Sequence, residues 1–220
     1  MTGYFRCALC AGVLLGCLLF VSCGTLPEVV TDAQSPAARE LVDLRKAEAG
    51  LKFDVRYASA ANFTHERLYP TPDVYLRKDA AAALLRVQRD LRKDGLGLKI
   101  FDGYRPYHVQ QKMWDLVRDE RYVSNPAKTA GRHTRGTAID VTLVDRSGRE
   151  LPMPTAYDDF TERAHREAAG IPDAARANSK RLESAMARHG FQPYPFEWWH
   201  FDFTGWEQHP PLDVPFAALR

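Results

Sequence analysis

The chain has 220 residues, of which 45% are hydrophobic and 26% are charged, so it is long enough for one globular domain with a sizeable core. Lys and Arg together number 30 and Asp and Glu number 28, which gives a net charge of +2. Such a balance excludes the strongly basic character of a typical nucleic-acid-binding protein, and we expect no nucleic-acid partner.

The N-terminal stretch has the features of a targeting segment. It carries all four cysteines of the chain, at positions 7, 10, 17 and 23, so the rest of the chain cannot form a disulfide. Arg6, the apolar run 8–21 and the small residues after it are typical of a secretory signal peptide, since a transmembrane helix needs about 20 apolar residues. An uncleaved membrane anchor is the alternative interpretation.

The segment L-F-V-S-C-G at 19–24 resembles a bacterial lipobox, in which the cysteine becomes the lipidated first residue of the mature protein. We therefore expect a signal peptide of the lipoprotein type over 1–22 and an exported protein. It would be periplasmic or a membrane-anchored lipoprotein, attached to the membrane through Cys23. Cleavage before Cys17 and plain signal cleavage are the competing possibilities.

Residues 23–36 contain two prolines and show no periodicity, which predicts a tether ahead of a folded domain over 37–220. The first half of that domain is expected to contain a short helix over 38–49 and a strand over 51–57. The clearest helix is predicted over 79–94 and is ended by Gly95.

The second half shows the following pattern of elements. A strand leads from 98 into a turn near 105, helices are expected over 106–121, 161–169 and 178–189, and strands over 137–144 and 197–203. Strands are expected to carry all three candidate metal ligands, and helices lie elsewhere. This order indicates an α+β fold, a small and mainly antiparallel sheet flanked by helices.

Two separated motifs suggest a metal site. His133 and Asp140 form an H-x6-D pattern, and Glu197 and His200 form a later E-x2-H pattern. Two histidines and one carboxylate make an open zinc site, whose fourth position holds a water with a pKa lowered to about 7. Glu197 is then a spare carboxylate beside a ligand. A lone histidine near tryptophans is more often a packed or surface residue, but the two motifs together favour metal binding.

These motifs resemble those of a known family. The segments D-G-Y-R-P (102–106), H-x-R-G-x-A-x-D (133–140), E-W-W-H (197–200) and Y-A-x-x-x-N-F (57–63) resemble those of the D-alanyl-D-alanine dipeptidases. These zinc enzymes include the vancomycin-resistance dipeptidases and are more distantly similar to zinc D,D-carboxypeptidases and the hedgehog signalling domain. The resemblance implies the same α+β fold and one Zn²⁺ per chain, bound by His133, Asp140 and His200.

The resemblance also implies roles for four other residues. Glu197 would be the catalytic base, and Arg105 would stabilise the oxyanion of the tetrahedral intermediate. Asp158, with Asp159 as its rival, would bind the substrate's α-ammonium group, and Tyr57 would help to hold the substrate. Other interpretations are a surface turn residue for Arg105, a helix N-cap for Asp158, and a tyrosine packed over a strand end for Tyr57.

The chain departs from the family pattern near His133. The family usually has S-x-H, whereas this chain has G-R-H at 131–133, which removes one expected contact to the substrate carboxylate and leaves Arg132 as a candidate substitute. The connection over 105–133 is also shorter than in the vancomycin-resistance members, so longer substrates are not excluded.

The expected function is zinc-dependent hydrolysis of the dipeptide D-alanyl-D-alanine to two D-alanines, linked to peptidoglycan turnover. Two alternatives stay open: a zinc D,D- or L,D-carboxypeptidase that acts on peptidoglycan stem peptides, and a non-catalytic zinc-stabilised binding domain.

Overall fold

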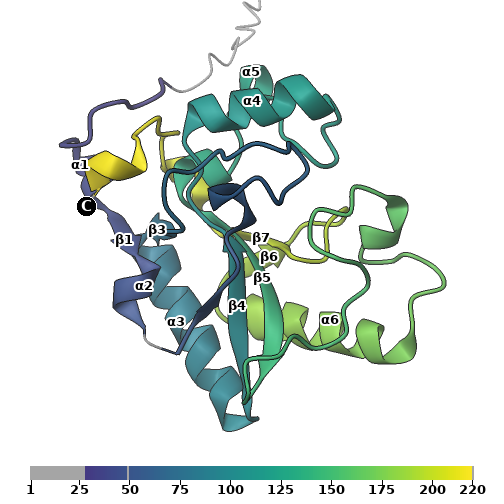
Figure 1. Ribbon diagram of the computed structural model, residues 1–220. Helices are drawn as coiled ribbons and strands as arrows, with labels where there is room; N and C mark the ends of the chain where they lie inside the picture. Colours follow the sequence, from purple (N-terminus) through teal and green to yellow (C-terminus); the bar gives the residue numbers. More distant parts are fainter. Residues whose placement is uncertain (1–27, 49, 220) are drawn as a thin grey trace, which may run out of the picture.

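The computed structural model describes residues 28–48 and 50–219. Its centre is a five-stranded sheet in which one edge pair is parallel and the other pairs are antiparallel. The strands in spatial order are β2 (Lys52–Phe53), β4 (Leu96–Asp102), β5 (Ala138–Asp145), β7 (His200–Phe203) and β6 (Phe191–Pro193) (Figure 1). The expected α+β fold with a mainly antiparallel sheet is confirmed.

Two long helices, α3 (Lys78–Lys93) and α6 (Asp173–Ala187), contact each other and pack against the sheet (Figure 1). The buried residues of α3 include Ala80, Leu84 and Val87, which recur at the three- and four-residue spacing of one helix face. Such local periodicity explains why the sequence predicted α3 to within one residue at each end.

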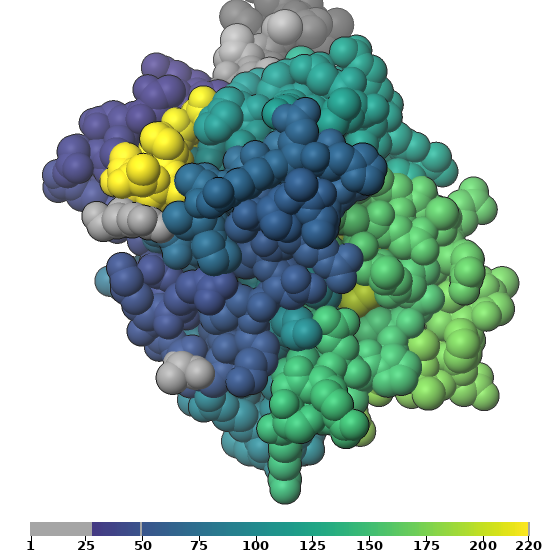
Figure 2. All heavy atoms as spheres, in the orientation of Figure 1, coloured from purple at the N-terminus to yellow at the C-terminus, as the bar shows by residue number. Residues whose placement is uncertain are grey.

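The connection between β4 and β5 forms one end of the molecule. It contains α4 (Tyr107–Val117) and α5 (Pro126–Thr129), which contact each other (Figure 1). In Figure 2 the dark blue segment near residue 60 and the green segment near residue 160 meet on the viewed face, and the rings of Phe63 and Phe160 lie 5.0 Å apart.

The N-terminal part of the domain differs from its predicted single helix over 38–49. It forms two one-turn helices, α1 (Pro36–Arg39) and α2 (Leu44–Ala47), with β1 (Leu41–Asp43) between them. Strand β1 pairs antiparallel with β3 (Tyr75–Arg77), so its backbone groups bond to a partner strand and not along a helix.

The helix predicted over 161–169 is wrong, because only the 3₁₀ turn η3 (Glu162–Ala164) forms there. The carbonyl of Ala164 accepts the backbone N–H of Trp198 at 3.0 Å, and the N–H of Arg166 donates to Pro195 at 3.0 Å. These backbone groups are used by the loop before β7, which leaves them unavailable for helical hydrogen bonds.

In the tail after Thr204, three apolar residues, Leu212, Val214 and Phe216, are buried in the core. The segment carries the 3₁₀ turns η4 (Trp206–Gln208) and η5 (Phe216–Leu219). The N–H of Leu212 donates to Thr134 at 2.8 Å, and Val30 bridges to Leu212 from the other side.

No helix within residues 28–48 and 50–219 has the length and apolar character needed to cross a bilayer. The expected signal peptide and the expected lipid attachment at Cys23 lie outside the described residues.

Candidate metal centre

Three neighbouring strands place polar side chains in one row across the sheet. Asp102 at the end of β4 pairs with Asp140 of β5, and Asp140 pairs with His200 at the start of β7. An irregularity in the β4–β5 register between Ile100 and Asp102 brings Asp102 into this alignment. Directly opposite residues of paired strands have Cβ atoms about 4.5–5.5 Å apart, so the register itself assembles most of the site.

His133 reaches the same place from a turn and not from a strand. It begins the 3₁₀ turn η2 (His133–Arg135), which follows Ala130 and Gly131, both with positive φ (60° and 79°). The hydroxyl of Thr134 donates to the carbonyls of Ala130 and Gly131 at 2.9 Å each. This local bonding holds the sharp bend that turns His133 inward, so the expectation that strands carry the ligands is wrong for this one.

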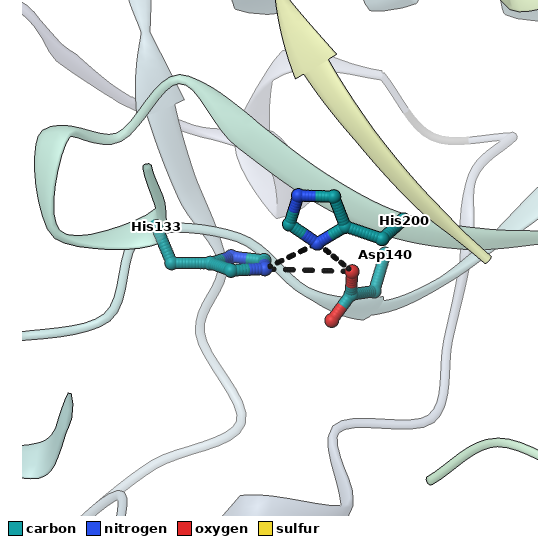
Figure 3. A group of neighbouring side chains, drawn as sticks. All are labelled: His133, Asp140 and His200. Carbon is teal, nitrogen blue, oxygen red and sulfur yellow. Dashed lines mark hydrogen bonds and ion pairs between the residues drawn. The ribbon is translucent and has the colours of Figure 1, made fainter. Parts of the chain in front are cut away.

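The three predicted ligands converge (Figure 3). His133 Nε2 lies 3.1 Å from His200 Nδ1 and 3.4 Å from Asp140 Oδ1, and His200 Nδ1 lies 3.0 Å from Asp140 Oδ1. All three side chains are buried. Ligands on a tetrahedral zinc ion with bonds of about 2.1 Å are separated by about 3.4 Å, so this triangle has the size that zinc requires.

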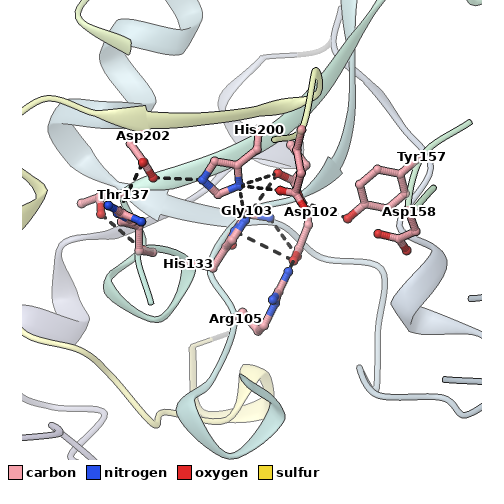
Figure 4. Close-up of polar contacts among 12 residues, drawn as sticks. Asp102, Gly103, Arg105, His133, Thr137, Tyr157, Asp158, His200 and Asp202 are labelled. Atoms are coloured by element: carbon pink, nitrogen blue, oxygen red, sulfur yellow. Dashed lines mark hydrogen bonds and ion pairs between the residues drawn. The ribbon is translucent and has the colours of Figure 1, made fainter. Parts of the chain in front are cut away.

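Hydrogen bonds on the outer side of each ring orient the donors inward. His133 Nδ1 lies 2.7 Å from the carbonyl of Gly103, which can only accept, so Nδ1 carries the hydrogen and Nε2 keeps its lone pair. His200 Nε2 faces Asp202 Oδ1 at 3.0 Å (Figure 4). Lone pairs of two imidazoles and a carboxylate then point at one position, an arrangement that calls for a cation.

Asp140 itself is held by a residue that the sequence did not indicate. The hydroxyl of Tyr157 donates to Asp140 Oδ2 at 3.0 Å, while Asp140 Oδ1 is buried and has no hydrogen-bond partner among the described residues. The Tyr157 ring stacks on Phe101 at 4.4 Å. That oxygen is the one in the ligand triangle, where ring nitrogens of His200 and His133 lie 3.0 and 3.4 Å away, which supports its assignment as a metal ligand.

The pKa values in the site reflect crowded negative charge. Burial alone would lower the pKa of His200, but Asp202 and Asp140 raise it to about 10. Burial raises the pKa of Glu197 well above its usual value; His200 opposes this shift, and Asp140 and Asp158 add to it. A divalent cation in the triad would offset this accumulation of charge.

Glu197 enters the pocket from the loop that precedes β7. The strand predicted over 197–203 begins only at His200, because the chain turns at the buried pair Trp198 and Trp199. Trp198 Nε1 donates to Thr155 Oγ1 at 2.9 Å, which fixes this turn. Glu197 Oε2 lies 3.8 Å from His200 Nδ1, so the carboxylate is beside the ligand triangle without belonging to it.

Arg105 is a buried residue of the pocket and not a surface turn residue. Its Nη2 and Nε donate to Asp102 Oδ2 at 2.7 and 3.1 Å, and its Nη1 donates to Gln110 Oε1 at 2.8 Å. The guanidinium is therefore fixed beside the triad. Asp102 stood in the quoted D-G-Y-R-P motif without a role, and Gln110 gave no sequence signal.

Asp158 and Tyr57 also line this pocket, whereas Asp159 does not. The hydroxyl of Tyr57 donates to Asp158 Oδ1 at 2.9 Å. Asp158 Oδ2 is buried and has no hydrogen-bond partner in the described part of the chain. Burial raises the pKa of Asp158 to about 7, against the lowering effect of the Tyr57 hydrogen bond.

The helix N-cap interpretation of Asp158 is wrong, because η3 is capped by Thr161 and Asp158 has a positive φ of 63°. A non-glycine residue in that conformation is strained. Tyr57 fits both of its interpretations: it packs edge-on against Phe63 and Tyr69, and its hydroxyl points into the pocket.

The loop between α4 and α5 forms part of the pocket lining, through Tyr122 and its neighbours. The Tyr122 ring stacks on Phe160 at 5.2 Å, and its hydroxyl lies 3.2 Å from His165 Nε2. The connection between Arg105 and His133 thus covers one side of the site.

Comparison with known proteins identifies the family. Residues 37–216 match a family model described as D-ala-D-ala dipeptidase. The chain is 36% identical over 180 residues to the D-alanyl-D-alanine dipeptidase of Escherichia coli K12, covering 82% of this chain and 93% of that protein.

The chain belongs to the D-Ala-D-Ala dipeptidase family.

A second dipeptidase of this family, from Enterococcus faecium, is 32% identical over 172 residues, which cover 69% of this chain and 85% of that protein. Among solved structures, the LdcB LD-carboxypeptidase aligns with a TM-score of 0.40 and 25% identity, over 61% of each chain. Membership of the D-Ala-D-Ala dipeptidase family confirms the expectation of a metallopeptidase, and the His–Asp–His triad is consistent with zinc.

Proposed function

We propose that this protein hydrolyses D-alanyl-D-alanine to two D-alanines and thereby takes part in peptidoglycan turnover. The proposal rests on one observation above all: the three converging donors of His133, Asp140 and His200 share one pocket with a carboxylate that is not part of the triangle, Glu197. The relatives at 36% and 32% identity are named D-alanyl-D-alanine dipeptidases, and we propose the same substrate and one Zn²⁺ per chain here.

The residues around the triad fit peptide hydrolysis. A zinc ion would supply Lewis acidity, which lowers the pKa of water to about 7 and polarises the substrate carbonyl. Glu197 accepts the proton of the attacking water and returns it to the leaving amine. Arg105, held by Asp102 and Gln110, presents a fixed positive charge to the carbonyl oxygen as negative charge develops there.

Asp158 is suited to recognise the free amino end of the substrate. Tyr57 occupies Oδ1, and Oδ2 is left with an unused lone pair in a buried position. An α-ammonium group would satisfy that oxygen with a charge-assisted hydrogen bond. A blocked amino end offers a neutral amide instead and leaves the carboxylate charge without a partner.

The first prediction follows from this pocket. We expect D-Ala-D-Ala to be cleaved with kcat/KM at least about tenfold above that of N-acetyl-D-Ala-D-Ala, because a buried carboxylate without its partner costs about 1–3 kcal/mol or more. Steady-state kinetics on both dipeptides measure the ratio.

Asp158→Asn should reduce this ratio, chiefly by lowering kcat/KM for the free dipeptide. The neighbouring Asp159→Asn is the matched control, because Asp159 lies outside the pocket lining, and it should leave the ratio unchanged. Equal kcat/KM for the two substrates in the wild-type protein would contradict the proposal and favour the carboxypeptidase acting on stem peptides.

The second prediction concerns Arg105. Arg105→Met should lower kcat by about 10²–10³, the cost of removing one oxyanion donor in other enzymes. Arg105→Lys keeps the positive charge but loses the pair of hydrogen bonds that Nε and Nη2 make to Asp102. Its kcat should lie between those of the wild type and Arg105→Met. A methionine variant that binds zinc, folds normally and keeps kcat within a few-fold would contradict this role.

We further propose that the protein is an exported lipoprotein anchored through Cys23, in the periplasm where the cell has an outer membrane. The support is the arrangement of Arg6, the apolar run 8–21 and the lipobox-like segment 19–24. Lipid chains supply the anchoring energy in such proteins.

The third prediction tests this proposal. Cys23→Ser should move the protein from the membrane fraction to the soluble fraction, and Cys17→Ser is the control that should stay with the membrane. Mass spectrometry of the mature N-terminus gives the direct measurement. An unmodified chain that begins after Cys23 would contradict anchoring.

A further inference from the structure

Asp202 lies behind His200 on the side away from the ligand triangle (Figure 4). The two residues are separated by one position on β7, so both side chains lie on the same face of the sheet. Asp202 Oδ1 faces His200 Nε2 at 3.0 Å, and the Asp202 side chain is only 10% exposed. This carboxylate therefore contacts a proposed metal ligand without facing the metal position.

The second oxygen of Asp202 faces a cation. Asp202 Oδ2 lies 3.3 Å from Nε of Arg132, the residue that immediately precedes His133. The guanidinium of Arg132 also lies over the ring of Trp206, 4.8 Å from its centre, in the segment that follows β7. Arg132 thus spans from the turn that carries one histidine ligand to the strand that carries the other.

We propose that Asp202 is a positioning residue for His200 and that Arg132 acts on the same ligand through Asp202. Asp202 fixes the hydrogen of His200 on Nε2, which leaves the lone pair of Nδ1 directed at His133 and Asp140. Arg132 holds Asp202 in the orientation that this hydrogen bond requires. This inference rests on the proposed zinc site.

The physical reason is that a carboxylate behind an imidazole ligand does two things. It fixes the ring's tautomer and orientation, and it increases the electron density that the opposite nitrogen donates. Loss of such a partner typically weakens metal binding by about 10–100-fold. In the equivalent place His133 Nδ1 contacts the neutral carbonyl of Gly103 at 2.7 Å, and the carboxylate of Asp102 lies farther off, with Oδ2 at 3.9 Å. The carboxylate in direct hydrogen-bonding distance of a ligand ring is therefore the one behind His200.

The experiment is a double-mutant cycle read out as the zinc dissociation constant, measured by competition with a chelator of known affinity. Asp202→Ala should weaken zinc binding about 10–100-fold. Arg132→Met should weaken it by a smaller factor in the wild-type background and by less than twofold when Asp202 is already alanine, because its effect passes through Asp202.

The matched control is Asp90→Asn, which removes the carboxylate from a histidine–aspartate pair distant from the site. Asp90 Oδ2 lies 2.8 Å from His189 Nε2, between α3 and the end of α6. This variant should bind zinc as tightly as the wild type. Asp202→Asn keeps the side-chain volume and serves as the second test variant should Asp202→Ala fold poorly.

Cobalt substitution gives a readout that a purely structural role would not change. The visible absorption bands of Co²⁺ bound to Asp202→Asn should shift relative to the wild type, because the donor strength of His200 changes, whereas Asp90→Asn should reproduce the wild-type spectrum.

Two results would overturn the inference: zinc affinity of both Asp202 variants within twofold of the wild type, or an Arg132→Met effect that is equal in both backgrounds. The second result would show that Arg132 acts independently of Asp202. A wild-type protein that takes up no zinc would instead refute the proposed function, so the two failures are distinguishable.

Discussion

Glu197→Gln should retain its zinc and lose about 10²–10⁴-fold in kcat. That range is the usual contribution of a positioned general base. The amide keeps the shape of the side chain beside the ligand triangle but cannot accept the proton of the attacking water. The metal should stay because Glu197 lies beside the triangle and is not one of its corners.

Metal content and turnover of the same preparation decide this prediction. Glu167→Gln, an exposed glutamate that pairs with Lys180, is the control and should match the wild type in both measurements. Loss of zinc from Glu197→Gln would show that the roles of base and ligand have been confused. Undiminished turnover would show that Glu197 takes no part in the reaction.

Replacing either histidine ligand should have a still larger effect. His133→Ala and His200→Ala should each reduce bound zinc well below one equivalent and abolish measurable hydrolysis, because two remaining donors hold zinc poorly. Treatment of the wild type with a chelator should abolish activity in the same way, and added zinc should restore it.

The control is His108→Ala, an exposed histidine paired with Asp213 away from the pocket, which should keep full zinc content. Elemental analysis across the three variants gives the answer. Undiminished zinc in His133→Ala or His200→Ala would contradict the ligand assignment even if activity were lost.

Features with a local signal could be predicted from the sequence. Helix α3 was predicted because its apolar periodicity lies within the helix itself. Likewise, Glu197 and His200 stand three residues apart, so a single turn brings both to one pocket. His133 and Asp140 are also close in sequence. The two motifs meet in space only because of the register between β5 and β7, which no local pattern predicts. The expectation that they share one metal ion came from the presence of both motifs and from the family resemblance.

Partners that are remote in sequence were missed. Tyr157 reaches Asp140 only because the loop after β5 folds back over the sheet, and no local pattern marks that contact. The position of Asp202 could have been predicted, since it stands two residues after His200 and a strand places both side chains on one face. The E-x2-H motif gives roles to Glu197 and His200 only and none to the residues that follow them in the strand. The helix expected over 161–169 failed for a related reason, because its backbone partners come from the loop before β7.

The burial of Leu212 has a consequence for how the protein matures during biosynthesis. The turn that carries His133 is held from outside by the hydrogen bond between Leu212 and Thr134, and Val30 closes over the same segment. A ribosome delivers Val30 long before Leu212. A growing chain therefore cannot complete the support of His133 until Leu212 has been synthesised.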